Sequence, residues 1–218
     1  MTEILKLMEI VGTIAFALSG ALVAIGAGLD VFGVAFLACI TAFGGGTIRD
    51  TILGINPPSI FTDFKIFLVA VVVALLTFIV AYVFKEKFNS FKTKIETINN
   101  IFDAIGLSAF VVIGSEIPCA YGFLDNGFVV VFCGMITGAG GGIFRDVLIG
   151  TTPYVFKKHI YAVAAIIGSV IYFLLRKYTQ NIELASLVSM LLVFIIRMLA
   201  TKFHWSLPKI ENDDNNLV

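Results

Sequence analysis

Long apolar stretches separated by short polar segments dominate this chain. Seven stretches contain no charged residue: Ile10 to Leu29, Val31 to Ile48, Ile66 to Phe84, Ala104 to Ser115, Gly127 to Phe144, Ile160 to Leu175 and Leu184 to Ile196. The longer ones approach the roughly 20 residues that an α-helix needs to cross a bilayer, and the shorter ones reach that length with flanking residues. The pattern predicts an all-α membrane protein with seven transmembrane helices.

The composition supports a membrane location. The chain has 218 residues, of which 59% are hydrophobic and 14% charged, and its mean hydropathy is +1.00. The first apolar stretch is too long for the core of a signal peptide, so we expect it to remain as a helix. A net charge of zero argues against a nucleic-acid partner. Cys39, Cys119 and Cys133 lack metal-ligand spacing and are expected to pack as small apolar residues.

One polar run near the end of an apolar stretch occurs twice, 96 residues apart. Its first copy comprises Thr41, Gly44, Gly45, Gly46, Arg49, Asp50, Gly54 and Pro57. Its second copy comprises Thr137, Gly140, Gly141, Gly142, Arg145, Asp146, Gly150 and Pro153. Each copy places an ionisable pair at about membrane depth, where charges are costly and usually face a partner or a wet cavity. We therefore expect the function to reside in this doubled element.

A wider match indicates that a whole three-helix block is duplicated. With a shift of 94 residues, Glu9, Gly12, Ala15, Phe16 and Gly20 match Asp103, Gly106, Ala109, Phe110 and Gly114. We expect repeat one over about 4–84, a linker over 85–98, repeat two over about 99–175, a seventh helix over about 184–203 and a disordered polar tail over 204–218. A unit with an odd number of spans emerges on the far side, so its second copy enters inverted. In proteins built from inverted repeats the ion or substrate site lies at the repeat interface.

The triple glycines favour a kink or local unwinding of the second and fifth helices. Each glycine costs about 1 kcal/mol relative to alanine in a helix interior, and the freed carbonyls could face a cation in a water-filled path. The alternative is that the glycines let another helix approach closely, as small residues do in membranes. Because the run is repeated and an arginine follows three positions later, we favour the break.

The ionisable pairs are expected to find their partners in other helices. Neighbouring residues point about 100° apart on a helix, so Arg49 and Asp50 should not easily pair with each other. Pairs across the repeats, or of each arginine with a carboxylate at the start of its repeat, remain open: Arg49 with Asp146, Arg145 with Asp50, or either arginine with Glu9 or Asp103. Such pairs could line a pore or clamp the two halves together.

Three further polar positions have simple interpretations. Thr41 and Thr137 precede the glycines by one turn, and their hydroxyls could line a path or bond back to their own helix. Arg197 lies toward one end of the last predicted helix, where we expect its side chain to reach the interface.

Lysine and arginine positions predict the orientation. One side of the membrane receives Lys85, Lys87, Lys92, Lys94, Lys157, Lys158, Lys202 and Lys209. The other side receives Lys6, Lys65, Arg176 and Lys177. Because cytoplasmic segments are enriched in these residues, the C-terminus is expected in the cytoplasm and the N-terminus outside.

The duplicated GGGxxRD run, the paired stretches around Phe16 and Phe110, and the layout of three plus three plus one helices resemble the bacterial branch of the trimeric intracellular cation (TRIC) channel family. The resemblance covers the chain from about Glu9 to Phe203. It implies a homotrimer in the inner membrane, in which each protomer has a pore bounded by kinked second and fifth helices and passes monovalent cations, mainly K⁺. The same domain has also been labelled a glycine transporter. The motif positions of both copies are then the candidate pore or ion-binding residues, with Glu9 and Asp103 as supporting charges.

Two functions stay open at this point. The first is a passive cation channel, and the second is a secondary transporter for glycine or a similar small solute, in which helix N-termini bind a carboxylate. The chain is short for a carrier, which favours the channel. No nucleophile, base or metal-ligand cluster is placed with another, so we expect neither an enzyme nor a cofactor, and no metal beyond permeant K⁺. The glycine runs also lack the lysine of a phosphate-binding loop.

Overall fold

The computed structural model describes residues 2–85, 92–157 and 160–205. Within these ranges it contains no strand and seven helices that are long and apolar enough to span a membrane. These are α1 (Glu3–Gly26), α2 (Val31–Ile52), α3 (Phe64–Val83), α5 (Lys92–Pro118), α6 (Gly127–Leu148), α8 (Tyr161–Thr179) and α9 (Ile182–Lys202). Three short elements connect them: η1 (Ser59–Phe61), η2 (Cys119–Phe123) and α7 (Tyr154–Lys157). The predicted all-α, seven-span class is confirmed.

The element bounds differ from the predicted ones mainly between the repeats. α5 begins at Lys92, inside the stretch expected to link the two repeats, so this helix is longer than its apolar part. Most of the expected polar tail, 206–218, and residues 86–91 of the linker lie outside the described residues.

Polar residues at the helix starts explain where the spans begin. Asp30 caps α2 by accepting a hydrogen bond of 2.8 Å from the Gly33 amide, and Asn126 caps α6 through the Val129 amide. Each side chain satisfies a backbone N–H that has no partner within its helix. These caps stand at corresponding places, before the second helix of each repeat.

Glycines end the same two helices. Gly54 follows α2 with φ of +70°, and Gly150 follows α6 with φ of +73°. A glycine in this left-handed region closes a helix because it has no Cβ to clash, and its neighbours bond back to the last carbonyls. Ile55 donates to the Asp50 carbonyl and Thr151 to the Asp146 carbonyl. The last members of the repeated run are therefore a helix stop.

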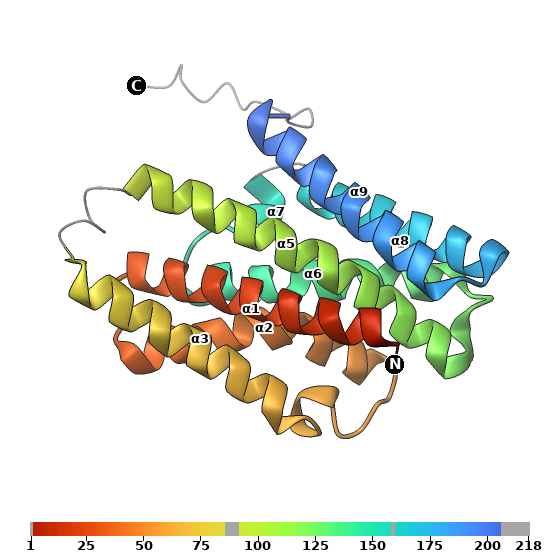
Figure 1. Cartoon of the computed structure of the whole chain (residues 1–218), viewed down its shortest axis with the longest axis horizontal. Coiled ribbons are helices and arrows are strands. Elements are labelled where there is room, and N and C mark those ends of the chain that lie inside the picture. The colour runs from red at the N-terminus through yellow and green to blue at the C-terminus, as the bar shows by residue number, and fades with distance from the viewer. Residues whose placement is uncertain (1, 86–91, 158–159, 206–218) are drawn as a thin grey trace, which may run out of the picture.

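The helices form one bundle with α1 and α5 side by side near its middle and running in opposite directions (Figure 1). α3 flanks α1 and α2, and α8 and α9 cover the other side of the bundle (Figure 1). α9 ends at the opposite end of the bundle from the start of α1, as an odd number of spans requires. α5 is the most buried of the seven and α3 the most exposed, so the apolar surface of α3 is available to lipid or to another subunit.

The first helices of the two repeats meet through a reciprocal aromatic contact. The rings of Phe16 and Phe110 lie 5.3 Å apart, and both side chains are buried. A Cβ on Gly106 would collide with the Phe16 ring, and a Cβ on Gly12 would come within 3.2 Å of the Phe110 ring. Each glycine thus makes room for the phenylalanine of the other repeat, which explains why this pair of residue types occurs twice.

The second helices cross at the triple glycines without losing their winding. α2 and α6 are continuous α-helices through 44–46 and 140–142, so the expected unwinding is wrong. A Cβ on Gly45 would collide with the Thr137 carbonyl oxygen, and a Cβ on Gly141 with the Thr41 carbonyl oxygen. The missing side chains allow backbone-to-backbone contact, and this packing offsets the low helix propensity of glycine.

Candidate functional site

Arg49 and Asp50 form an ion pair at the end of α2. Arg49 donates from Nε and Nη2 to Asp50 Oδ1 over 2.8 and 2.6 Å, and both side chains are almost fully buried. The other carboxylate oxygen, Oδ2, accepts from the Ser59 amide at 2.8 Å. Asp50 therefore holds its own arginine and the returning loop at the same time.

The second repeat has the same arrangement at the end of α6. Arg145 Nε donates to Asp146 Oδ1 at 2.8 Å, and Asp146 Oδ2 accepts from the Tyr154 amide at 2.7 Å. The prediction that neighbouring Arg and Asp residues would not pair is wrong. The 100° separation applies to the Cβ directions, whereas an arginine side chain is long enough to fold across the end of its helix. Neither cross-repeat Arg–Asp pair is found among the described residues.

Arg145 also has the partner that the sequence offered in the first helix of its repeat. Its Nη1 donates to Asp103 Oδ1 at 3.0 Å and to Ser19 Oγ at 2.7 Å. Arg49 makes no equivalent of either bond with any residue that the structure describes. Ile113 stands at the repeat position that corresponds to Ser19, and the described residues include no ion pair of Glu9. The two arginines therefore differ in how tightly they are held.

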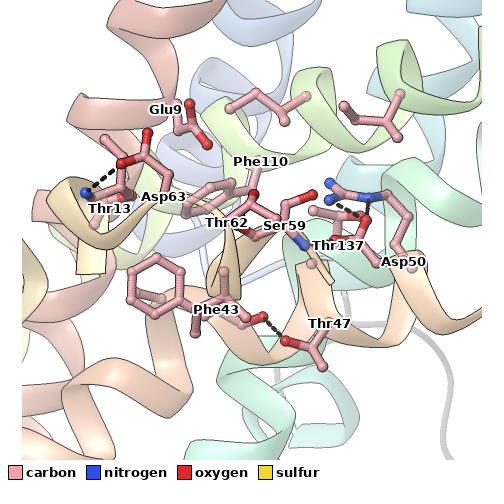
Figure 2. Close-up of a pocket in the computed structure, with 17 residues that line it drawn as sticks. Glu9, Thr13, Phe43, Thr47, Asp50, Ser59, Thr62, Asp63, Phe110 and Thr137 are labelled. Atoms are coloured by element: carbon pink, nitrogen blue, oxygen red, sulfur yellow. Dashed lines mark hydrogen bonds and ion pairs between the residues drawn. The ribbon is translucent and has the colours of Figure 1, made fainter. Parts of the chain in front are cut away.

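A cavity of about 200 Å³ opens beside Arg49. Figure 2 shows the carboxylates of Glu9 and Asp63 together at one side of it and Asp50 at the other. Thr13 lies on the same wall; its side chain is fully buried, and its Oγ1 has no hydrogen-bond partner. We call Glu9, Thr13, Arg49, Asp50 and Asp63 the first half-site.

The first half-site is polar and acidic. Its three carboxylates face one guanidinium, a formal charge of −2. The cavity is large enough for several water molecules, and a buried hydroxyl without a partner at its wall is a ready ligand for water or a cation. Apolar side chains, among them Phe43 and Phe110, complete the lining (Figure 2). The arrangement attracts cations and disfavours anions.

A second cluster occupies the corresponding place in repeat two. We call Asp103, Arg145, Asp146, Tyr161 and Arg197 the second half-site. Arg197 comes from α9, which has no counterpart in repeat one. Its Nη2 lies 3.9 Å from Asp103 Oδ2, and its guanidinium lies over the Tyr161 ring, 4.5 Å from the centroid.

The expectation that Arg197 reaches the membrane interface is wrong. The residue is only 2% exposed, and its guanidinium points into the bundle, where Asp103 and Tyr161 attract it. Because Arg197 directly follows the last apolar stretch, its sequence position favours a side chain that reaches the interface. Its burial, however, depends on which helices pack around α9. The local signal for that packing is a stripe of small and polar residues on one face of α9, among them Ser186, Ser189 and Arg197, and it does not specify the neighbouring helices.

Most of the predicted site residues divide into three groups in the structure. Some line the cavity of the first half-site: Gly46, Arg49, Asp50 and Thr137. Others serve the contact between α2 and α6: Gly44, Gly45, Gly140 and Gly141. Thr41 and Thr137 both donate to the carbonyl four residues earlier, so the back-bonding alternative is confirmed for both hydroxyls. Gly142, Arg145 and Asp146 lie at the second half-site.

Sequence reasoning missed three residues of the two half-sites. Asp63 lies at the end of the loop after α2, Thr13 corresponds to Leu107 in repeat two, and Tyr161 lies at the start of an apolar stretch. Each becomes part of a site only through tertiary packing. The one local signal for a site residue among the three is the carboxylate of Asp63, directly before a span. The same position also fits a helix cap, a role that Asp63 has at the start of α3.

The fold and the two half-sites define a polytopic membrane protein with a duplicated charged element at its centre. A family profile described as "Glycine transporter" matches the chain twice, over residues 6–83 and 100–177. Both bounds are shifted by 94 residues, the offset found for the first helices. The two matches are independent support for an internal repeat.

Relatives and solved structures cover nearly the whole chain. The UPF0126 inner membrane protein YadS of Escherichia coli K12 is 37% identical over 95% of this chain and 97% of its own length. YvgT, a UPF0126 membrane protein of Bacillus subtilis, is 33% identical over 93% and 95%. A prokaryotic TRIC channel crystallised in 0.5 M KCl is 37% identical, with a TM-score of 0.83 over 95% of this chain and all of that one.

A TRIC cation channel orthologue from Rhodobacter sphaeroides has a TM-score of 0.82 at 29% identity, covering 94% of this chain and all of that one. The identity and coverage place the chain in one family with these proteins. It belongs to the bacterial branch of the TRIC family, which includes the UPF0126 membrane proteins.

Proposed function

We propose that this protein is a cation channel of the bacterial inner membrane and that it conducts K⁺ and other monovalent cations. The observation that carries the proposal is the acidic, water-accessible first half-site, because a formal charge of −2 inside low-dielectric walls concentrates cations and repels anions. Glu9 and Asp63 supply this charge without a paired guanidinium of their own among the described residues.

We infer that the path runs along the interface of the two repeats, from the first half-site past the crossing of α2 and α6 to the second half-site. The reciprocal contacts at Phe16 and Phe110, and at Gly45 and Gly141, support an arrangement of inverted repeats. In this arrangement Gly46, Arg49, Asp50 and Thr137 line the outer end. The remaining glycines of the motif hold the walls together.

The assembly that we propose is a homotrimer with one path in each protomer. The TRIC channel orthologue from Rhodobacter sphaeroides is described as trimeric. The exposed apolar surface of α3 fits contact with lipid or with a neighbouring subunit at that face. The orientation proposed is N-terminus outside and C-terminus in the cytoplasm, so that the first half-site opens outward.

The matching family profile names glycine transport, and we treat that as the competing function. A glycine carrier needs a cationic or helix-N-terminal site for the carboxylate of its substrate. The only guanidinium at the described first half-site, that of Arg49, is already bound by Asp50 through two hydrogen bonds. The surplus carboxylates there would repel a second carboxylate. This charge balance favours the cation channel.

Purified protein in a planar bilayer between unequal KCl solutions tests the proposal. We expect unitary currents whose reversal potential lies near the K⁺ equilibrium potential, because the first half-site favours cations. Absence of current, together with saturable uptake of labelled glycine into liposomes, would establish the carrier instead.

A pair of variants connects the current to the first half-site. E9Q removes one of its surplus charges and should lower K⁺ conductance most at low ionic strength, where screening is weakest. E3Q is the matched control, because Glu3 is on the same helix but is exposed and pairs with Lys6 outside the cavity. Equal conductance of E9Q and wild type at all salt concentrations would exclude Glu9 from the path.

A further inference from the structure

The two half-sites differ in what occupies the space next to their Arg–Asp pairs. In the first half-site this space is a cavity of about 200 Å³. In the second half-site the side chains of Tyr161 and Arg197 fill the space next to Asp103, and all three residues are at most 3% exposed. The difference comes from α9, because it is the one transmembrane helix of the described chain that lies outside the two matched repeats.

The charges of the two half-sites differ in the same way. The first half-site has three carboxylates and one guanidinium. The second half-site has two carboxylates, Asp103 and Asp146, and two guanidinium groups, Arg145 and Arg197. Arg197 thus supplies, as part of the chain, a positive charge that brings this half-site to neutrality.

Charge and aromatic rings hold Arg197 there. Within the part of the chain that the structure describes, its Nε and Nη2 have no hydrogen-bond partner, and neither have the nearby Asp103 Oδ2 and the Tyr161 hydroxyl. Its guanidinium lies 4.5 Å from the Tyr161 ring centroid and 5.9 Å from that of Tyr154. Unsatisfied polar atoms at this depth are costly. If the Arg197 side chain were removed, Asp103 Oδ2 and the Tyr161 hydroxyl could bind water or another cation.

We propose that Arg197 is a tethered cation that closes the path at the second half-site in this conformation: its guanidinium occupies the place of a mobile ion and keeps water and external cations out. Withdrawing this side chain converts the second half-site into a cavity like the first. The identity of the mobile ion rests on the proposed function. The occupancy of the half-site by Arg197 does not rest on the proposed function. It can therefore be tested even if the protein proves not to conduct ions.

Thiol labelling at two matched positions tests the proposal. Thr13 lines the first half-site, and Leu107 is its repeat counterpart, fully buried on the same face of α5 as Asp103 and one turn away from it. T13C and L107C are made in full-length protein whose native cysteines are replaced by alanine, and each is exposed to a small cationic methanethiosulfonate. Both side chains are fully buried, but Thr13 borders the cavity, so with Arg197 present we expect T13C to react faster than L107C.

Removing the Arg197 side chain should raise the reactivity of L107C. In L107C/R197A we expect the labelling rate to rise by about tenfold or more, because access no longer requires local opening of the bundle. Methylguanidinium added to the solution should then slow the reaction by occupying the vacated place. R197K retains a tethered cation, so L107C/R197K should stay protected.

Each outcome bears on the proposal. T13C/R197A must label as fast as T13C, which shows that the variant keeps the fold of the first half-site. If L107C reacts equally with and without Arg197, or if methylguanidinium does not protect L107C/R197A, Arg197 is not a plug and the proposal fails. If the bilayer recording shows no K⁺ current but the L107C labelling behaves as expected, the channel function is rejected and the occupancy of the second half-site by Arg197 still holds.

Discussion

The two buried arginines of the motif have different numbers of partners, and this difference controls what a single substitution does. Among the described residues Arg49 is hydrogen-bonded to Asp50 alone, whereas Arg145 is bound by Asp146, Asp103 and Ser19. Removing one member of a buried ion pair leaves an uncompensated charge. The cost should therefore be larger in the first repeat, although the two motifs are identical at these positions.

We predict that D50N lowers the free energy of unfolding by roughly 3 kcal/mol and that D146N lowers it by clearly less. Asparagine can still accept the loop amide, so the comparison isolates the lost charge. The thermal midpoints of both variants in the same detergent provide the measurement. An equal or larger loss for D146N would mean that Asp103 and Ser19 do not support Arg145.

The crossing of α2 and α6 determines which glycines can change. A Cβ on Gly45 or Gly141 would collide with a backbone carbonyl of the other helix, which cannot rotate away. A Cβ on Gly46 finds its nearest neighbour, Arg49 Nη2, at 3.6 Å, which is ordinary van der Waals contact. Adjacent glycines of one triplet therefore have opposite tolerance.

We predict that G45A and G141A each destabilise the protein by about 1–3 kcal/mol through overpacking. G46A should be neutral or stabilising by up to about 1 kcal/mol, because alanine is the better helix former. Thermal unfolding of the three variants beside wild type measures the difference. If all three variants behaved alike, the triplet would matter for helix flexibility rather than for close approach.

The seven spans and the repeat can be predicted from the sequence, whereas the winding of α2 and α6 cannot. Apolar length predicts the seven spans, and the 94- and 96-residue offsets predict which residues correspond, because both depend on the order of residues alone. The winding at 44–46 could not be predicted, since three glycines fit both a break and a close contact until the neighbouring helix is known.

The site was predictable to a similar extent. Arg49, Asp50, Arg145 and Asp146 were found because charges in apolar stretches are rare. Arg197 is also noticeable in the sequence as a charge beside an apolar stretch, but its predicted location at the membrane interface is wrong. Its position in the bundle depends on how α9 packs against α5 and α8, and a single helix sequence with polar residues on one face does not specify its neighbours.

At the scale of the whole molecule, the charges of the loops and those of the two half-sites point the same way. The end of the bundle that carries the start of α1 has few lysines and arginines and includes the acidic Glu9 and Asp63. The opposite end has most of the lysines, together with the neutral second half-site. Positive segments stay in the cytoplasm during insertion, so the acidic cavity should face outward.

Two single-cysteine variants in a background without native cysteines test this predicted orientation. T62C lies beside the first half-site and A27C lies in the loop after α1, and both positions are exposed. A membrane-impermeant maleimide applied to spheroplasts should label T62C at once, whereas A27C should react only after the membrane is permeabilised. The reverse pattern would put the acidic cavity in the cytoplasm. Cations would then be concentrated at the inner mouth, and E9Q would reduce outward rather than inward K⁺ current.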